Sequence, residues 1–506
     1  MNNSENIKLK EQNFESPQCN IPKEKIIDRI IENGYFTKYP IFITISIFVC
    51  FIANGLVTNI FNLIIIPTKK YFKASDFITE TMAGILFIGL AIGSGLASFL
   101  SEKYGRAKII KLFSGVMCIT YLISTIIFNL FIFLLSRIIL GLSVGIIEPL
   151  IFNTFGEYLP SKFRGFLLMN SWFFYTLAVF LENVIALKIM PYLESEHLQR
   201  YLLVLNFFFI LNYVINHFIL NDSPRNLIIK SMQGKNFYER ESKINEAVKI
   251  LNNMNRTPLS KIEEEKLISE LYNSSSNKTK TNSSFKELFS QKYLKTTYIG
   301  IFIFFVYSCG YFGFYIISTL TLEILNKKEN EKISEIENKN SNKDIIKNQI
   351  YIAFFDLLGS FVGGCLAEIK SIGRKGVIWI FMLLSAITLI PSCFSVTLFN
   401  IFFTVSITFS AIYGDMLITY ISEIFPTKLR DISSSFFLTS HRISGFISQF
   451  LFLALFKINY KLPFFFGSLL NIIGVMTIFM LPYESIGKPL DYEEVVEQRD
   501  NNQIEF

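Results

Sequence analysis

Six ionisable residues interrupt the long apolar stretches of this sequence, and their chemistry needs explaining first. They are Arg137, Glu148, Glu182, Asp356, Asp415 and Arg442. In an apolar solvent such as a lipid bilayer, each charge costs about 2.5–3.5 kcal/mol on insertion scales, so each needs a partner, a water-filled cavity or a function. These residues are therefore the best sequence evidence for what the protein does.

Arg442 lies about ten residues into an apolar stretch that predicts a helix over about 432–456. A rise of about 1.5 Å per residue places its guanidinium near the middle of a bilayer. Thr439, Gly445 and Gln449 recur on the same helical face and make a polar stripe. A planar guanidinium offers paired hydrogen bonds to a carboxylate, so Arg442 is a candidate receptor for an anionic substrate. The alternative is an ion pair with an acid on a facing helix.

Tyr307, Tyr311 and Tyr315 recur every four residues and therefore share one face of a predicted helix. Their hydroxyl groups need hydrogen-bond partners when buried, while their rings can hold a planar or apolar substrate body. The alternative is ordinary helix packing. Gly310 and Gly313 in the same segment favour a broken or flexible helix that could serve as an outer gate.

The four acids are candidates for proton coupling, because a low dielectric favours the neutral form of a carboxyl group. They are Glu148, Glu182, Asp356 and Asp415. The alternative is that each acid pairs with a nearby Arg or caps an irregular turn. Arg137 and Glu148 share a face with Gly141 and Gly145, small residues suited to close helix contact, so a structural pairing is the stronger interpretation there.

The elements that position these groups are twelve predicted membrane-spanning helices. Hydrophobic residues make up 51% of the 506 residues and the mean hydropathy is +0.41, more than a soluble core of this length can bury. Apolar stretches repeatedly reach the roughly 20 residues that a hydrocarbon core about 30 Å thick requires. The predicted spans are about 40–66, 79–100, 108–127, 129–154, 165–189, 200–220, 295–322, 348–368, 375–396, 398–421, 432–456 and 461–482.

The predicted fold class is an all-α integral membrane protein with two pseudo-symmetric six-helix bundles. The bundles are residues 40–220 and 295–482, and the remaining segments are an N-terminal tail (1–39), a linker (221–294) and a C-terminal tail (483–506). Part of the linker, Tyr272–Phe285, has too few apolar residues to fold alone. We expect the charged insert Asn326–Asp344 to be a solvated loop.

Lys and Arg in the short loops set the predicted orientation. They gather after the second, fourth, eighth and tenth spans, which puts these loops and both termini in the cytoplasm of a multi-pass protein; which membrane holds it is left open. The first 38 residues contain no apolar signal-peptide core. The net charge of +7 lies mostly on the tails and these loops, which favours an anionic lipid surface over nucleic acid.

Several classes are excluded on residue types. The three His and six Cys are scattered, so we expect neither a zinc site nor a disulfide framework, and no cofactor or metal. No nucleophile with a paired base is evident, and no phosphate-binding loop of the G-x-x-x-x-G-K-[ST] kind, so we expect neither an enzyme nor an ATP-driven pump. The expected partners are the lipid bilayer, a small-molecule substrate and a proton, and the protein is expected to be a monomer.

A charged signal recurs at the same place in both halves. "LSEKYGRAKII" (Leu100–Ile110) and "LAEIKSIGRKGVIWI" (Leu366–Ile380) both follow the second helix of a half. This repetition predicts a duplicated transporter in which one half rocks against the other around a midplane site. A Glu, Lys and Gly-Arg loop can pair with a neighbouring helix end and hold the cytoplasmic side shut. The alternative is that short cytoplasmic loops are simply basic.

These motifs resemble the major facilitator superfamily over nearly the whole chain. "RIILGLSVGIIEPLIFNTFGEYLPSKFRG" (Arg137–Gly165), "DSPRNLI" and "YISEIFPTKLRDISSSFFLTSHRISGF" (Tyr420–Phe446) are similar to its organic-ion and synaptic-vesicle-related branches. The resemblance implies two six-helix bundles of the major facilitator fold. It also implies cytoplasmic gating by the charged and Gly residues of the motifs, which here are Glu102, Gly105, Arg106, Arg137, Glu157, Arg164, Arg225, Gly373, Arg374, Glu423 and Arg430.

The resemblance also bears on the substrate. In these branches an Arg at the position of Arg442 is associated with anions, and members carry organic anions, organic cations or nicotinate-like vitamins. The synaptic-vesicle-related group has an acid midway along its first helix, where this chain has Asn54. Because Asn54 cannot bind a cation by charge, this departure favours an anionic or neutral substrate.

We therefore expect a secondary transporter for a small organic anion, nicotinate- or pantothenate-like, that could work as a proton symporter. Arg442 would receive the negative group, and the pocket would be shaped by Tyr307, Tyr311, Tyr315, Asn54 and Gln449. A sugar, polyol or organic-cation porter is the transporter alternative, and a membrane sensor or scaffold without transport is the alternative of another class. An Arg442 turned toward the acyl chains, or neutralised by a neighbouring acid with no room for a guest, would count against the anion hypothesis so strongly that only the scaffold would survive.

Overall fold

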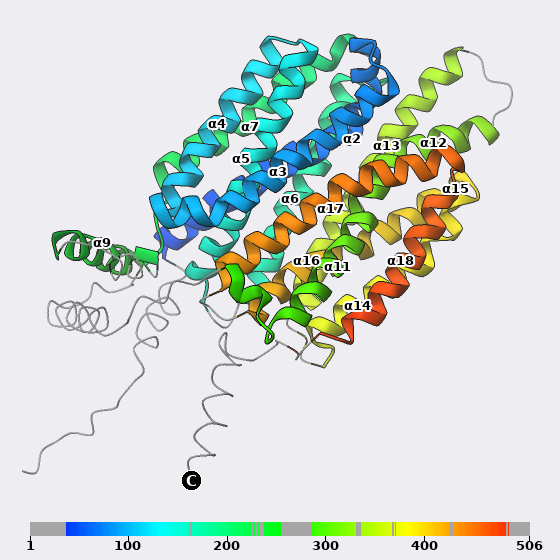
Figure 1. Cartoon of the computed structure of the whole chain (residues 1–506). Helices are drawn as coiled ribbons and strands as arrows, with labels where there is room; N and C mark the ends of the chain where they lie inside the picture. The colour runs from blue at the N-terminus through cyan, green and yellow to red at the C-terminus, as the bar shows by residue number, and fades with distance from the viewer. Residues whose placement is uncertain are drawn as a thin grey trace, which may run out of the picture. The chain divides into compact units, whose positions relative to one another are not determined.

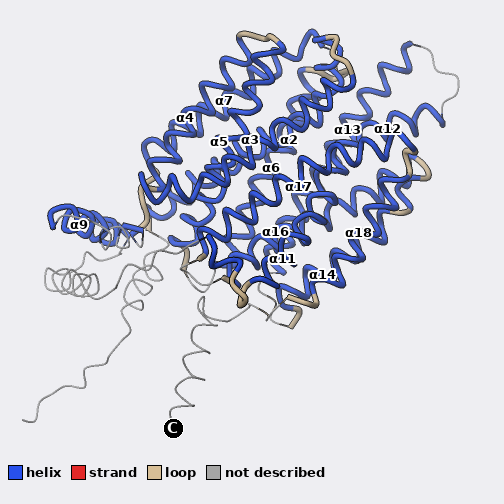
Figure 2. Tube along the Cα trace, in the orientation of Figure 1, coloured by secondary structure: helices blue, strands red, loops and turns tan. Residues whose placement is uncertain are grey.

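The computed structural model describes residues 37–160, 164–193, 195–224, 226–227, 231, 237–254, 285–329, 335–366, 369, 371–425, 429–481 and 484. Its contacts divide the chain into two compact units. One unit is Met1–Pro40 with Pro224–Lys278, and the other is Ile41–Ser223 with Thr279–Phe506. All regular elements in the described residues are helical (Figure 2).

The first half of the larger unit contains six long helices (Figure 1). They are α2 (Lys38–Phe72), α3 (Asp76–Tyr104), α4 (Arg106–Ile126), α5 (Leu130–Tyr158), α6 (Arg164–Ile189) and α7 (Leu198–Ile219). Polar residues start two of them. Ser75 accepts a hydrogen bond from the Ile78 amide at the start of α3, and Asn129 accepts one from Phe131 at the start of α5, as expected of N-cap residues.

The second half repeats this organisation with two interrupted helices. Its elements are α11 (Leu294–Ser308), the π-helical turn η4 (Cys309–Gly313), α12 (Phe314–Glu329), α13 (Glu335–Leu366), α14 (Gly373–Leu389), α15 (Val396–Leu398), the π-helical turn η6 (Phe399–Phe403), α16 (Thr404–Ile424), α17 (Arg430–Ile458) and α18 (Leu462–Ile478). Here α11, η4 and α12 make one span, and α15, η6 and α16 make another. The twelve predicted spans are confirmed.

Hydropathy alone identifies fewer spans than the fold contains. Ten helical stretches in the described residues are long and apolar enough to cross a membrane, and α18 is a shorter apolar helix. The 29-residue helix α17 is long enough to span as well, but it carries the polar stripe that includes Arg442. Large apolar side chains such as Phe131 and Phe218 lie more than 70% exposed on the outer helix faces, as expected of a surface that contacts lipid.

One expectation about the connecting segments is wrong. The insert Asn326–Asp344 is not a loop throughout, because α12 continues to Glu329 and α13 already begins at Glu335. Its Glu and Lys residues have high helix propensity, so the helices extend beyond the apolar cores. The linker contains the helix α9 (Phe237–Met254), whose apolar side chains, among them Ile244 and Leu251, are buried. Its stretch Tyr272–Phe285, apart from Phe285, lies outside the described residues.

Glycines bring α3 and α5 into close contact within the first half. A Cβ atom on Gly141 would lie 2.3 Å from the carbonyl oxygen of Leu86, and one on Gly145 would lie 2.3 Å from that of Leu90. Backbones can approach this closely only where side chains are absent. The predicted small-residue contact surface on α5 is confirmed, and it fixes the height at which Glu148, three residues after Gly145, meets the second half.

The two halves meet along two helix pairs, α3 with α17 and α6 with α13. Figure 1 shows α3 and α17 side by side. Hydroxyl groups bond across this contact: Ser98 Oγ lies 2.5 Å from Ser435 Oγ, and Thr439 Oγ1 donates to Ser94 Oγ at 3.3 Å. These paired helices flank the space in which the central charged residues lie.

Candidate functional site

A small cavity lies between the halves, at the level of the central charges. Its interior volume is about 20 Å³, which holds roughly one water molecule. The first half lines it with α5 and α6, and the second half with α11, η4, α16 and α17. The polar side chains that line it include Glu148, Tyr175, Tyr307, Tyr311, Asp415 and Arg442. The structure is therefore closed around its centre, with no room for an organic guest.

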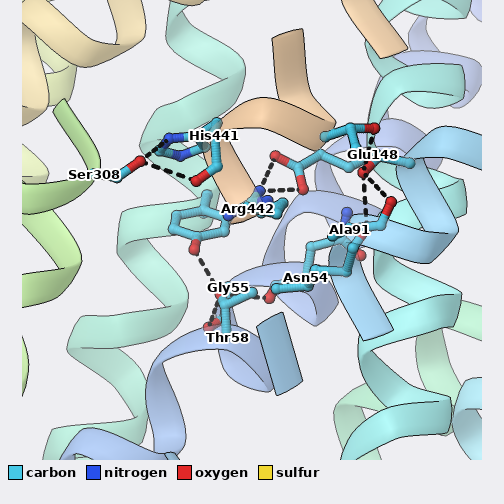
Figure 3. A network of polar contacts seen from close by, with 12 residues as sticks. Asn54, Gly55, Thr58, Ala91, Glu148, Ser308, His441 and Arg442 are labelled. Atoms are coloured by element: carbon cyan, nitrogen blue, oxygen red, sulfur yellow. Dashed lines mark hydrogen bonds and ion pairs between the residues drawn. The ribbon is translucent and has the colours of Figure 1, made fainter. Parts of the chain in front are cut away.

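Arg442 and Glu148 form an ion pair across this centre. The Nη2 atom of Arg442 lies 2.5 Å from Glu148 Oε1 and also bonds Oε2, and both residues are 3% exposed. Figure 3 shows the two side chains pointing toward each other from α17 and α5. The guanidinium also lies 5.6 Å from the ring centroid of Phe312. This is the alternative that the sequence left open, and it means that Arg442 carries no unbalanced charge in the closed structure.

The predicted pairing of Arg137 with Glu148 is wrong, because Glu148 reaches the second half instead. The Nη1 atom of Arg137 contacts the carbonyl oxygen of Val57 at 3.4 Å, and its guanidinium lies 5.3 Å from the ring centroid of Phe61. Twenty residues separate Arg137 from Glu157 on α5, which is about 30 Å along a helix. Arg137 therefore does not join the other expected gating residues.

Glu182 also lies away from the cavity. It is 1% exposed within the first half, and its backbone carbonyl accepts a hydrogen bond from the Tyr201 hydroxyl at 3.1 Å. Its Oε2 atom has no hydrogen-bond partner among the described residues. Of the four acids predicted to couple protons, Glu148 and Asp415 line the cavity, whereas Asp356 and Glu182 do not.

The tyrosines of the seventh span surround an acid. Tyr311 donates to Asp356 Oδ2 at 2.9 Å, and Tyr315 donates to the same oxygen at 3.1 Å. Tyr307 and Tyr311 line the cavity, but Tyr315 lies behind it. The predicted interruption of this helix takes the form of the π-helical turn η4, which contains both Gly310 and Gly313. Such turns are common at functional positions of helices.

Two further predicted pocket residues support the helices instead of lining the cavity. Gln449 donates from Nε2 to the carbonyl oxygen of Phe312 at 3.2 Å and so satisfies a backbone group of the π-helical turn. Asn54 is fully buried, and neither its Oδ1 nor its Nδ2 atom has a hydrogen-bond partner within the described ranges. Its backbone carbonyl instead accepts from Thr58 at 2.9 Å (Figure 3).

Sequence reasoning missed a second polar group at the centre. His441 lies beside Arg442, and its Nδ1 atom is 2.7 Å from Ser308 Oγ (Figure 3). Its ring stacks on that of Tyr307, with centroids 4.9 Å apart and an angle of 6° between the planes. Tyr175 of α6 was missed as well. The signal for His441 was its place next to Arg442, within the same polar helix.

The repeated loop holds an ion pair in the first half. Arg106 Nη1 lies 2.5 Å from Glu157 Oε1, and Ser223 donates to the other carboxylate oxygen. Asp222 accepts from the Ala107 amide at 2.8 Å, at the start of α4. Glu102, in the last turn of α3, is exposed. The acid that forms the ion pair with Arg106 is Glu157 of α5. Gly105 has φ of 100°, a conformation that favours glycine.

The second half repeats this arrangement. Arg374 pairs with Glu423 of α16, and Gly373 has φ of 71°. Glu484 accepts from the amides of Arg374 at 2.8 Å and Lys375 at 3.0 Å, at the start of α14. It follows the last helix of its half, as Asp222 follows α7. Both capping acids were missed. Arg225 lies outside the described residues, as do the side chains of Arg164 and Arg430.

Comparisons with known proteins agree with this architecture. A family model described as "Sugar (and other) transporter" matches residues 41–496. The chain belongs to this transporter family. The predicted membership of the major facilitator superfamily is thereby confirmed, and the protein is a multi-pass membrane transporter and not an enzyme.

Individual relatives of the transporter are distant. It is 23% identical over 505 residues to "Putative transporter SVOPL" from Danio rerio, with 94% of this chain and 92% of the relative covered. It is 24% identical over 239 residues to "Arabinose-proton symporter" from Bacillus subtilis, covering 46% of this chain and 48% of that protein. The first of these agrees with the resemblance to the synaptic-vesicle-related branch.

Solved structures show the same fold. The proton:xylose symporter XylE bound to 6-bromo-6-deoxy-D-glucose superposes with a TM-score of 0.69 at 16% identity, covering 90% of the transporter and 99% of that chain. A structure described as the inward open conformation of XylE from E. coli superposes with a TM-score of 0.65, at 16% identity and with 90% and 99% covered. At these identities the likeness concerns the fold alone.

Proposed function

We propose that the transporter carries a small organic carboxylate by alternating access, together with protons. The closed structure meets the condition set against an anion, since Glu148 neutralises Arg442 beside a cavity with no room for a guest. That condition is too strict for a protein whose halves move, because separation of the halves would part Glu148 on α5 from Arg442 on α17. The proposal therefore rests on the guanidinium that this separation would leave without its partner. Within the described residues, Arg442 is the one guanidinium that lines this cavity. A substrate carboxylate would replace Glu148 on the fork of Arg442 when the halves separate and water enters.

The charges around the cavity explain the need for protons. Arg442 contributes one positive charge, and Glu148 and Asp415 contribute two acids. A bound carboxylate would add a third carboxyl group next to a single guanidinium. Because uncompensated charges are costly in a closed, low-dielectric site, the displaced Glu148 must take up a proton before the halves close again. Transport of the anion would therefore require cotransport of protons.

The rings around the pair favour a substrate with a flat body. Trp172, Tyr307, Phe312 and His441 line the cavity together with Arg442. Aromatic faces of this kind bury a planar ring well, and the phenol and imidazole groups can hydrogen-bond its polar edge. We therefore infer a compact aromatic or heterocyclic carboxylate, of the nicotinate type, as the substrate class to test first.

A sugar or polyol is the second candidate, and one observation favours it. Glu148 neutralises Arg442 in the closed structure, so the centre offers a charge-balanced set of hydrogen-bonding groups, including Tyr175 and Asp415, that suits hydroxyl groups. Two relatives are described by name as an arabinose-proton symporter and a xylose symporter. A sensor or scaffold that does not transport remains the alternative of another class, and only flux measurements separate it.

Replacement of Arg442 separates these candidates. The full-length protein in proteoliposomes would be tested for uptake of labelled nicotinate and of labelled xylose, with Arg442→Gln against the exposed Arg200→Gln as the matched control. The proposal predicts nicotinate uptake that Arg442→Gln abolishes and Arg200→Gln preserves. Xylose uptake that tolerates Arg442→Gln would support the second candidate, and no flux of any solute would support the scaffold.

We also propose the orientation and the gating role of the loops. The ends at Arg106 and Arg374 would face the cytoplasm together with both termini, because positive residues gather there. Their ion pairs with Glu157 and Glu423 each join two helix ends of one half, and they would keep these ends in the shape in which the halves close on that side. A monomer would suffice, since both halves of the site come from one chain.

A further inference from the structure

We propose that Asp356 is the proton-carrying carboxyl group that couples protonation to closure of the seventh span, through the hydroxyl groups of Tyr311 and Tyr315. This inference rests on the proposed alternating access, and it names the residue and the contact that would link a proton to the movement. It concerns a site in the second half, separate from the ion pair of Arg442 and Glu148.

The hydrogen bonds of Asp356 are asymmetric. Its Oδ2 atom accepts from both tyrosine hydroxyls, at 2.9 Å from Tyr311 and 3.1 Å from Tyr315. Its Oδ1 atom is buried and has no hydrogen-bond partner in the part of the chain that the structure describes. The residue is 0% exposed. Because Oδ2 accepts two hydrogen bonds and Oδ1 accepts none, a proton can bind Oδ1 without displacing either tyrosine hydroxyl.

No described cation balances a charge on Asp356. Among the described residues, the titratable groups that interact electrostatically with Asp356 are Tyr307, Tyr311 and Tyr315 on the seventh span and Asp415 on α16, and Glu182 on α6 interacts with Tyr315. Apart from the three phenols, all are acids. The ionised form of Asp356 would therefore be both buried and unpaired in the closed structure, which is strongly unfavourable.

Charge counting over the closed core leads to the same conclusion. Leaving aside the two loop pairs, the buried Arg, Lys, Asp and Glu side chains of the described spans are Arg137, Arg442, Glu148, Glu182, Asp356 and Asp415, two guanidinium groups and four carboxyl groups. Glu148 is paired with Arg442. Asp415 lines the cavity, where a water molecule can reach it, and Ser360 donates to it at 2.9 Å. Asp356 has neither a cation nor the cavity beside it, so it depends most on a proton.

The tyrosines tie this acid to a part of the helix that can move. Tyr311 lies within the π-helical turn η4, and Tyr315 follows in α12. Movement of this segment would withdraw both hydroxyls, admit water and let Asp356 ionise. A proton from this water would bind Oδ1 before the segment returns, and it would be released to water on the other side after the halves have rocked. Only an O–H bond forms and breaks in this cycle.

The preference for closure should therefore depend on pH. Ionisation of Asp356 should shift the equilibrium from closed to open on the order of 100-fold, the factor that corresponds to the cost of one charge in a membrane interior. The sign is closed at lower pH and open at higher pH. Protonation of Glu148 would favour opening, because it breaks the ion pair with Arg442 that joins the halves. Opening at the acid end of the pH profile would therefore be assigned to Glu148 and not to Asp356.

One native tryptophan reports opening without any substrate. The chain has two Trp residues, and Trp172 lines the cavity and is 6% exposed. In a Trp379→Phe background, acrylamide quenching of Trp172 would be measured against pH in full-length protein in nanodiscs. The proposal predicts little quenching at lower pH and a transition to strong quenching at higher pH. Because the probe is the proton alone, the result is independent of whether any carboxylate is transported.

Two variants decide the assignment. Asp356→Asn keeps an oxygen that accepts from both tyrosines but cannot ionise, so the transition on the alkaline side should disappear and Trp172 should stay protected. Glu182→Gln replaces another buried acid, one that lies away from the cavity, and should keep the transition. A wild-type profile in Asp356→Asn, or loss of the transition in Glu182→Gln alone, would overturn the proposal.

A third variant covers the case in which Asp356→Asn fails to fold. Tyr315→Phe keeps the ring and removes one hydroxyl that holds the protonated Asp356 in the closed structure. Because only the closed state loses this hydrogen bond, opening becomes easier and the midpoint of the transition should move to lower pH by roughly half a unit to one unit. An unchanged midpoint would contradict the proposed contact.

Discussion

Replacement of Glu148 by Gln, or of Arg442 by Met, removes one charge of the central pair and leaves the other buried. Both residues are 3% exposed and their charged atoms are in direct contact, so values for exposed pairs do not apply. Removal of one partner from a buried pair costs about 3–5 kcal/mol, because the remaining charge loses its compensation. Each single variant should therefore lose about 3–5 kcal/mol of unfolding free energy.

The double variant Glu148→Gln with Arg442→Met leaves no charge to compensate. Replacement of a whole buried pair by residues of similar volume is often close to neutral, so the double variant should be more stable than either single one. The coupling free energy from this double-mutant cycle should then be about 3 kcal/mol or more. Equilibrium unfolding of the purified protein by SDS in mixed micelles measures all four proteins. Additive losses in the double variant would refute the reasoning, since they would mean that the two charges do not compensate each other.

The close helix contacts and the repeated loop give two further predictions in the same unfolding assay. Gly145→Ala should destabilise the protein by about 1–3 kcal/mol, because its Cβ would lie 2.3 Å from the carbonyl oxygen of Leu90, whereas Gly95→Ala, with its nearest contact at 3.7 Å, should be neutral or slightly stabilising. Equal effects of these two substitutions would contradict the packing argument. Gly373→Ala should cost about 1–2 kcal/mol from its φ of 71°, with an added loss because the new methyl group would lie 2.6 Å from the Glu484 carboxylate. An unchanged stability in this variant would show that the turn at the start of α14 is not under constraint.

The helices of the transporter were predictable because their signal is local. A span needs mainly enough consecutive apolar residues, and ten helical stretches of the described residues meet this by length and hydropathy, whereas α18 is shorter and α17 carries a polar stripe. The flanks were less predictable: α12 and α13 extend into the charged insert, because helix propensity continues where hydropathy stops. The interruption of the seventh span was indicated by Gly310 and Gly313. Its form as a π-helical turn was not, and neither was the hydrogen bond that Gln449, far away in the sequence, donates to the carbonyl oxygen of Phe312 in this turn.

The partners of the charged residues were not predictable in the same way. Arg442 was identified as a central group, yet its partner Glu148 lies 294 positions earlier, and only the packing of the halves selects Glu148 over the other acids. Spacing along α5 suggested Arg137 for Glu148, because one helix face is all that the sequence can reveal. Similarly, the periodic tyrosines suggested a binding wall, whereas the Asp356 carboxyl that two of them contact belongs to another helix.

Uptake of labelled nicotinate into proteoliposomes under an imposed inward proton gradient tests the central claim most directly. The account predicts accumulation above the external concentration that collapses when the gradient is dissipated, and that is lost in Arg442→Gln. Wild-type vesicles that take up no carboxylate, or accumulation that is unchanged in Arg442→Gln, would contradict it.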